Sequence, residues 1–164
     1  MNMPKLLVFS INADEVNLDG DAAIGATSAS GAGGNIELQA GDINMENQSE
    51  ITAEAEGESG GGNININATN ITAKKDSTIS AFCISRDGGN ITIDTETLLG
   101  LDNSDITANA VEGDGGNINI TATSILGEQG NVLAIDPDGS QHFVRMFLMS
   151  HPGEEMCQST VGRK

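Results

Sequence analysis

Residues 88–94 of the chain read Gly-Gly-Asn-Ile-Thr-Ile-Asp, and this glycine-rich turn followed by alternating apolar and polar residues decides the fold. The same Gly-Gly-Asn triplet occurs at residues 33–35, 61–63 and 115–117. The asparagines of the four triplets are separated by 28, 27 and 27 residues. A fixed spacing of this length is typical of proteins built from stacked structural repeats.

The apolar residues recur at the same spacing as the triplets. Each asparagine is followed by two apolar residues with a polar one between them, and a later segment repeats as Ser-x-Ile-Thr/Ser-Ala. The columns of equivalent apolar residues include Ile36, Ile64, Ile91 and Ile118; Ile43, Ile71, Leu98 and Ile125; and Ala53, Ala81 and Ala108. Alternation of β-branched and polar residues indicates half-buried strands, about three short ones per unit.

A solenoid and an antiparallel sandwich both accommodate many short strands. The solenoid alone explains the fixed spacing, because equivalent residues then lie directly above one another in successive coils. We therefore predict an all-β fold, a right-handed parallel β-helix of about five coils of about 27 residues. The strands would lie on three faces, and the coils would stack at ~4.8 Å.

The repeat also predicts the domain organisation. The pattern reaches back to Phe9 and ends at Gly127, so residues 8–127 form the repeats, residues 1–7 are a leader or coil remnant, and residues 128–164 are a divergent tail. All three prolines lie outside residues 8–127, as expected where every inner strand pairs on both sides. The tail is predicted to be irregular or a short helix over residues 140–150, and to be a cap or disordered.

Composition and charge exclude several classes of partner. The 164 residues include 24 acidic and 7 basic side chains, and the net charge of −17 disfavours nucleic acids and anionic membranes. There is no apolar run long enough to span a bilayer, so no membrane insertion is expected. The apolar stretch near the start is shorter than the core of a signal peptide, and we expect no signal peptide in this chain.

Polar columns and the cysteine in the repeat are assigned structural roles. We predict that the asparagine column forms an amide ladder along the rod and that the serine column closes turns. The alternative for both columns is a polar stripe that binds a ligand. These columns are Asn35, Asn63, Asn90 and Asn117, and Ser49, Ser77 and Ser104. Cys83 falls among alanines and is predicted to be a buried small residue rather than a nucleophile.

Charged residues are compared across coils in the same way. Ion pairs that reduce repulsion are expected between Lys74 and Glu46, Lys75 and Asp102, and Arg86 and Glu58. Acids are expected to stack in three places, at Glu15 and Asp42, Asp19 and Glu46, and Asp87 and Asp114. These carboxylates are predicted to be solvated, with calcium bound between coils as the alternative.

The sequence contains no Ser-His-Asp set, phosphate-binding loop or Cys-x-x-Cys pair. In the tail, His142 and His151 lack companions at metal-ligand spacing, and residues 136–140 indicate a turn rather than half of a calcium loop. We therefore assign no catalytic, cofactor-binding or metal-binding residues, and we predict that the chain is not an enzyme.

Three units, at residues 88–94, 103–110 and 113–122, together with Ile-Leu-Gly at 125–127, resemble the repeats of a known family. These are the large exoproteins of the filamentous haemagglutinin type, often described as S-layer family proteins. The resemblance covers about residues 8–127. It implies a right-handed parallel β-helix at the cell surface, exported by two-partner secretion through an outer-membrane transporter, that acts in adhesion. The chain is expected to differ from the family in having no signal peptide and no N-terminal secretion domain, and in its unfamiliar tail.

The expected function is that of a segment of a secreted, surface-associated adhesin or structural rod, which binds cells, glycans or surfaces through extended polar faces. Neighbouring repeats of a longer rod, or self-association by coil ends, are expected partners, as is the secretion transporter. The alternatives are a non-functional gene fragment and a polysaccharide lyase or hydrolase. The enzyme is disfavoured because the acids are spread among the columns and no long loop walls a cleft.

Overall fold

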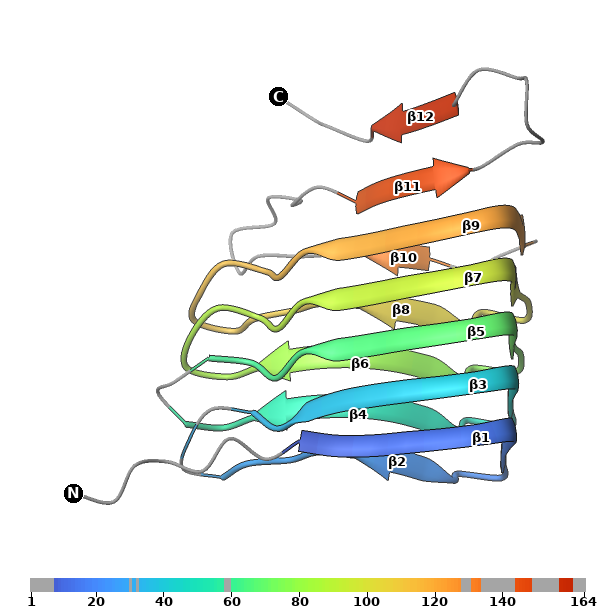
Figure 1. Ribbon diagram of the computed structural model, residues 1–164. Coiled ribbons are helices and arrows are strands. Elements are labelled where there is room, and N and C mark those ends of the chain that lie inside the picture. Colours follow the sequence, from blue (N-terminus) through green and yellow to red (C-terminus); the bar gives the residue numbers. More distant parts are fainter. Residues whose placement is uncertain are drawn as a thin grey trace.

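The computed structural model of the protein is a right-handed solenoid of parallel strands (Figure 1). It describes residues 8–29, 31, 33–57, 60–127, 131–133, 144–148 and 157–160. In Figure 1 the chain crosses the front from left to right, returns along the back, and rises by one coil per turn. The described residues contain strands and no helix. The predicted parallel β-helix is therefore confirmed.

Two sheets make up the solenoid, and each coil contributes one strand to each of them. The first sheet contains, in spatial order, β1 (Val8–Asp19), β3 (Asn35–Glu46), β5 (Ile64–Ala73), β7 (Ile91–Gly100), β9 (Ile118–Gly127), β11 (Val144–Leu148) and β12 (Cys157–Thr160). The second contains β2 (Ala23–Gly25), β4 (Glu50–Ala55), β6 (Thr78–Cys83), β8 (Asp105–Thr107) and β10 (Asn131–Leu133). The chain makes about four turns up to β8, and β9 and β10 begin a fifth.

The register between coils confirms the predicted columns. Ile64 pairs with Ile36 on one side and with Ile91 on the other, and Ile91 also pairs with Ile118. All four side chains are fully buried. Burial of one such side chain stabilises the fold by about 1.5–3 kcal/mol. Ordering the backbone of one coil costs more conformational entropy than the burial of its few apolar side chains offsets. The stability of the fold therefore depends on the stacking of several coils.

Each coil contains two strands rather than the predicted three, because the first strand bends. In β3, Ile36 and Leu38 are buried before the bend at Gly41, and Ile43 and Met45 are buried after it. The inward alternation shifts by one residue at the bend. One continuous strand therefore supplies two faces of the solenoid, which the sequence pattern alone divides into two strands.

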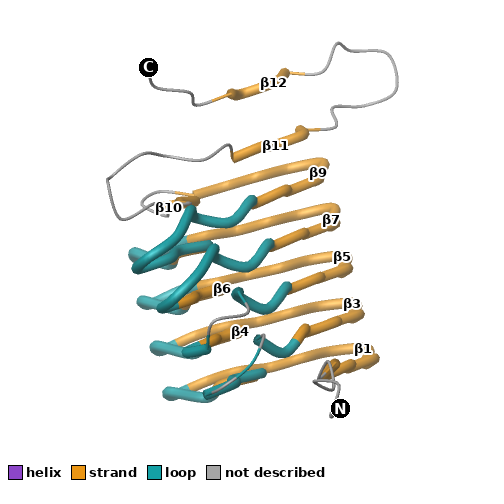
Figure 2. The backbone as a smooth tube through the Cα atoms, turned by 90° about the vertical axis from the view of Figure 1, so that its left-hand side faces the viewer, coloured by secondary structure: helices purple, strands orange, loops and turns teal. Residues whose placement is uncertain are grey.

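The Gly-Gly-Asn turns bring the backbones of successive coils into direct contact. They lie in the loops that lead from the second sheet into the next coil, and these loops stack on one another (Figure 2). A methyl group on Gly89 would overlap the carbonyl oxygen of Gly62, and one on Gly116 would overlap that of Gly89. Glycine is required at these positions because any side chain would occupy the space of the neighbouring coil.

The asparagine column forms the predicted amide ladder beside these glycines. Asn63 Nδ2 donates to Asn35 Oδ1 at 3.2 Å, and Asn90 and Asn117 each donate to the asparagine one coil earlier at 3.1 Å. The backbone N–H of the same three residues also donates to that oxygen, at 3.0–3.1 Å. The ladder provides hydrogen-bond acceptors for the backbone N–H groups of the turns, which confirms its structural role.

The serine column closes the turn between the two strands of a coil. Ser77 Oγ donates to the carbonyl oxygen of Lys74 at 2.6 Å, and Ser104 Oγ donates to that of Leu101 at 2.8 Å. Ser49 and Ser77 are fully buried, with their hydroxyl oxygens 3.3 Å apart. This column also has the structural role predicted for it.

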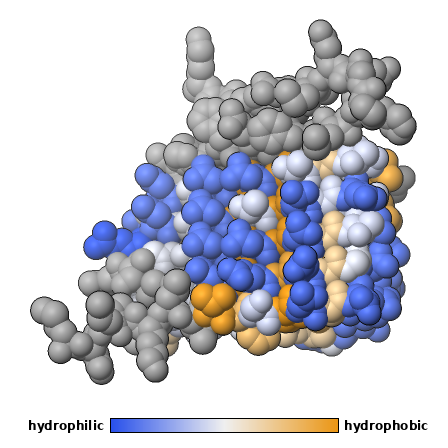
Figure 3. Space-filling view, viewed as in Figure 1, coloured by the Kyte–Doolittle hydropathy of each residue, from blue (hydrophilic) through white to orange (hydrophobic). Residues whose placement is uncertain are grey.

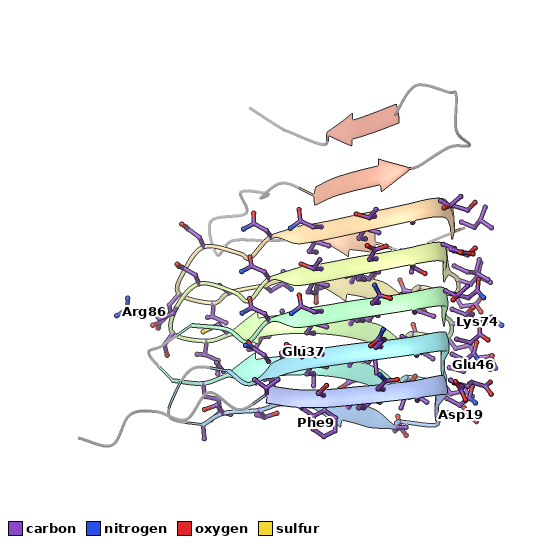
Figure 4. The ribbon with its side chains drawn as sticks, in the orientation of Figure 1. Phe9, Asp19, Glu37, Glu46, Lys74 and Arg86 are labelled. Atoms are coloured by element: carbon purple, nitrogen blue, oxygen red, sulfur yellow. The ribbon has the colours of Figure 1, made fainter. Side chains whose placement is uncertain are left out.

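Charged residues gather at the end of the long strands, where Figure 4 shows Asp19, Glu46 and Lys74 one above another. Lys74 Nζ lies 3.4 Å from Glu46 Oε1, as predicted. The predicted pair of Lys75 with Asp102 is wrong, because Lys75 Nζ lies 3.6 Å from Glu46 Oε2. Register sets the backbone neighbours, whereas the flexible lysine stem lets the ammonium reach a different coil. Glu58, the predicted partner of Arg86, lies outside the described residues.

The predicted stacks of acids are present, and amide or backbone donors accompany them. Glu15 pairs in register with Asp42, and Asp19 with Glu46. The next residue in the first of these columns is Asn70, whose Nδ2 donates to Asp42 Oδ1 at 2.7 Å. In the third stack the backbone N–H of Asp114 donates to Asp87 Oδ1 at 3.1 Å.

Strand pairing continues beyond residue 127. β10 pairs in parallel with β8, β11 pairs in parallel with β9, and β12 turns back antiparallel to β11. The short helix considered for residues 140–150 is therefore wrong over 144–148. Val144 and Met146 pair in register with Ile118 and Ile120. The apolar residues of this segment therefore follow the two-residue period of a strand rather than the three- and four-residue spacing of a helix. His142, His151 and residues 136–140 lie outside the described residues.

Candidate ligand-binding groove

A shallow groove of about 480 Å³ follows the corner at which the long strands bend. Three rows of residues line the groove, two along its sides and one along its floor. One side consists of Asn12, Gln39, Asn67, Asp94 and Thr121, and the far side of Thr69, Glu96 and Thr123. The floor consists of Ala13, Ala40, Ala68, Thr95 and Ala122. Each of these sets contains equivalent residues of successive coils. The groove therefore runs along the rod, in the direction of the hydropathy bands visible in Figure 3.

A second hollow of about 410 Å³ shares part of this lining and extends it toward the start of the strands. Together they define what we call the groove face, which consists of the outward residues in the first halves of the long strands. These residues are Ser10, Asn12, Glu37, Gln39, Asn65, Asn67, Thr92, Asp94, Asn119 and Thr121. They point outward because their neighbours in the sequence occupy the core.

Most side-chain amides outside the groove face are already paired between coils. On the second half of the strands, Asn44 Nδ2 donates to Asn17 Oδ1 at 3.0 Å, and Asn70 is bound to Asp42. At the far turn, Asn103 Nδ2 donates to Asp76 Oδ1 at 3.0 Å. These amides stabilise the stack, and they form their hydrogen bonds within the protein rather than with a ligand.

The groove face differs because most of its amides are uncommitted. Its one such bond in the described chain joins Asn12 Nδ2 to Gln39 Oε1, at 3.3 Å. The exposed side chains of Asn65, Asn67 and Asn119 have no hydrogen-bond partner among the side chains that the structure describes. Each free amide offers two donors and one acceptor to a ligand.

The 480 Å³ groove has no charged lining residue in the first three coils and becomes acidic in the fourth, while Glu37 adds a carboxylate to the groove face in the second coil. Asn12, Gln39 and Asn67 carry no charge, whereas Asp94 and Glu96 add two carboxylates. The basic residues of residues 8–127 in the described chain are Lys74, Lys75 and Arg86, and none of them lines either hollow, whereas Arg145 of β11 pairs in register with Asn119 beyond the last of these coils. Figure 4 shows Lys74 and Arg86 at opposite ends of the coils, with Glu37 between them on the groove face. An anionic polymer would therefore be repelled.

The groove offers groups suited to binding. Its lining consists of amides, hydroxyls, carboxylates and alanine methyl groups, with Ile11, Leu38 and Ile66 added in the second hollow, and it contains no histidine, cysteine or lysine. In the part of the chain that the structure describes, no three His, Cys, Asp or Glu side chains are grouped so that they could hold a metal ion. The same part contains no helix with the length and apolar character needed to cross a membrane.

Cys83 lies on the opposite sheet and has the predicted structural role. Its side chain is fully buried, between Ala55 of the preceding coil and Ala110 of the following one. A thiol enclosed in this way has no access to a substrate, so it fills space in the core as alanine does.

Comparison of the chain with family models, with curated proteins and with solved structures finds no match. The function is therefore inferred from the groove itself. From the sequence alone we expect extended polar faces, without residues assigned to a site. The outward positions were visible in the alternation, but the groove arises from the bend, and the free amides are recognised only once the paired ones are known.

Proposed function

We propose that the chain is a segment of an adhesive surface rod, which binds hydroxyl-rich polymers along the groove face. The observation that supports this proposal most directly is the set of free amides at Asn65, Asn67 and Asn119. They lie on one face, whereas most amides elsewhere on the described repeats are paired between coils. The protein acts by binding and performs no chemistry on its ligand.

A neutral linear polysaccharide matches the chemistry of the groove. Its hydroxyl groups both donate and accept hydrogen bonds, as do the amides of Asn65 and Asn67. The half-buried methyl groups of Ala13 and Ala40 offer a short apolar strip to the carbon–hydrogen faces of the sugar rings, because the floor residues of the later coils, Ala68 and Ala122, are buried. The coils repeat at ~4.8 Å, a distance close to the advance of one pyranose unit along an extended chain. Successive coils can therefore contact successive sugars.

The shape of the groove favours many weak contacts over one enclosed site. Each direct hydrogen bond contributes only about 0.5–1.5 kcal/mol, because it replaces a bond to water. Useful affinity therefore requires several coils to engage one polymer, and it increases with the number of contacts that the polymer makes. This is the behaviour expected of an adhesive surface.

The binding test compares a groove-face variant with a variant of the opposite sheet. The double substitution Asn65→Ala and Asn67→Ala removes two free amides from adjacent positions of β5, and we expect about a tenfold loss of affinity. Retardation in native gels that contain dextran, galactomannan or hydroxyethylcellulose measures this, with polygalacturonate as the anionic comparison. Thr52→Ala together with Thr78→Ala, on the second sheet, is the control. Equal retardation of both variants, or preference for polygalacturonate, would contradict the proposed ligand.

We also propose that the protein acts outside the cell, after export through an outer-membrane transporter. The support for this part is the resemblance to the large exoproteins. When the chain is joined to the N-terminal secretion domain of such an exoprotein and expressed with the matching transporter, we expect it to reach the cell surface. Digestion by protease added to intact cells measures this. Retention inside the cells would count against a surface role.

A further inference from the structure

The turn after β1 contains an aspartate followed by a glycine in open surroundings. Asp19 ends the strand with an exposed side chain, which Figure 4 shows at the edge of the stack, and Gly20 follows with a φ of +61°. A methyl group placed on Gly20 would meet nothing within 4 Å. The N–H of Gly20 makes no hydrogen bond to another residue that the structure describes. The peptide nitrogen that follows Asp19 is therefore unprotected by the fold.

An aspartate–glycine pair in such surroundings rearranges with water as the sole co-reactant. The peptide nitrogen of Gly20 attacks the carboxyl carbon of Asp19 and closes a five-membered succinimide ring, and the carboxyl hydroxyl leaves as water with the proton of the N–H. Water then opens the ring at either carbonyl group. One opening restores aspartate, and the other leaves the backbone running through the side-chain carbon, as isoaspartate. Glycine favours the attack because it has no Cβ to obstruct it.

The other aspartate–glycine pairs of the described repeats are held within the stack. Asp87 precedes Gly88, whose N–H donates to the carbonyl oxygen of Asp114 at 2.8 Å. A methyl group on Gly88 would lie 2.9 Å from two backbone atoms, so this turn is also crowded. Gly115, which follows Asp114, is buried. Attack at either pair therefore requires the turn to open first. A further pair, at residues 138–139, lies outside the described residues.

We infer that Asp19 is a modification site, at which the folded chain forms isoaspartate as it ages, while Asp87 and Asp114 are protected. The inference is independent of the groove ligand and of the surface role. The iso-linked residue carries a free α-carboxylate, the group that S-adenosylmethionine-dependent isoaspartyl methyltransferases esterify. Its extra backbone carbon also disturbs the turn, where Asn47 Nδ2 donates to Asp19 Oδ1 and the N–H of Asp21 donates to the carbonyl oxygen of Asn47.

The test follows each aspartate separately while the folded full chain is incubated at neutral pH. Digestion by a glutamate-specific protease places the four pairs on different peptides, which are residues 16–37, 59–96, 113–128 and 129–154. We expect isoaspartate at Asp19 to exceed that at Asp87 at least about tenfold, because attack at Asp87 waits for local opening of the turn. Electron-transfer fragmentation in a mass spectrometer distinguishes the two isomers. Labelled methyl transfer to the isolated peptides by isoaspartyl methyltransferase gives an independent measure.

The matched variant takes its two residues from the next coil, where the equivalent positions hold Glu46 and Asn47. The double substitution Asp19→Glu and Gly20→Asn keeps the charge and suits the turn, since Asn47 itself has a φ of 55°. Glutamate would have to close a six-membered ring, which forms far more slowly, so the isoaspartate of this peptide should be lost. In urea, where every turn is open, Asp19 and Asp87 of the parent chain should react at similar rates. Equal amounts at the two sites in the folded chain, or a signal that survives the double substitution, would refute the inference.

Discussion

Replacing Ile91 with aspartate is expected to lower the free energy of unfolding by more than about 4 kcal/mol. The side chain of Ile91 is fully buried between Ile64 and Ile118, so a carboxylate there has neither water nor a cation as partner. Burial of an unpaired charge in the core reduces the free energy of unfolding more than almost any other single substitution. Because each coil depends on its neighbours, several coils should unfold together, with one transition in urea followed by circular dichroism.

The neighbouring substitution Thr92→Asp is the control for Ile91→Asp. Thr92 is exposed and pairs in register with Asn65 and Asn119, so the added carboxylate remains in water. A loss below about 1 kcal/mol is expected for a surface change of this kind. If the two variants lose similar amounts of stability, the assignment of inward and outward positions is wrong.

Replacing Gly89 with alanine is expected to cost about 3 kcal/mol or more, although the change adds a single methyl group. The methyl carbon would overlap the carbonyl oxygen of Gly62 and lie 2.7 Å from its carbonyl carbon. Both are backbone atoms, so relief requires the coils to move apart at a turn that the amide ladder holds together. The free energy of unfolding in urea measures the loss.

Gly100→Ala is the matched control, because a methyl group at Gly100 would meet nothing within 4 Å. The equivalent residue one coil earlier is Ala73, which shows that the position accommodates alanine. We expect a change within about 0.5 kcal/mol. Similar losses for both variants would contradict the close approach of the coils at Gly89, because the backbone-entropy effect of replacing glycine with alanine stabilises a protein.

The sequence was sufficient to predict the stacking because identity between coils has a direct physical cause. Ile64, Ile91 and Ile118 share a column because each packs on the next, so the 27-residue spacing predicts the register before any coordinates are known. The same reasoning places Cys83 among alanines, since a narrow column admits only small side chains.

Features that depend on three-dimensional form were less accessible from the sequence. The bend at Gly41 joins two predicted strands into one, because the backbone ladder continues on both sides of the shift in alternation. The ammonium of Lys75 reaches Glu46, which the register does not predict for a long side chain. The groove follows from the bend, so its residues could be recognised as outward-facing without being recognised as a site.

The most direct test of the solenoid uses nuclear Overhauser contacts between isoleucine methyl groups in a selectively labelled sample. With coils stacked at ~4.8 Å, we expect contacts of Ile91 with Ile64 and with Ile118, while Ile64 and Ile118, two coils apart, show none. Absence of the contacts made by Ile91 would mean that residues one repeat apart are not neighbours. It would contradict the solenoid fold on which the groove depends.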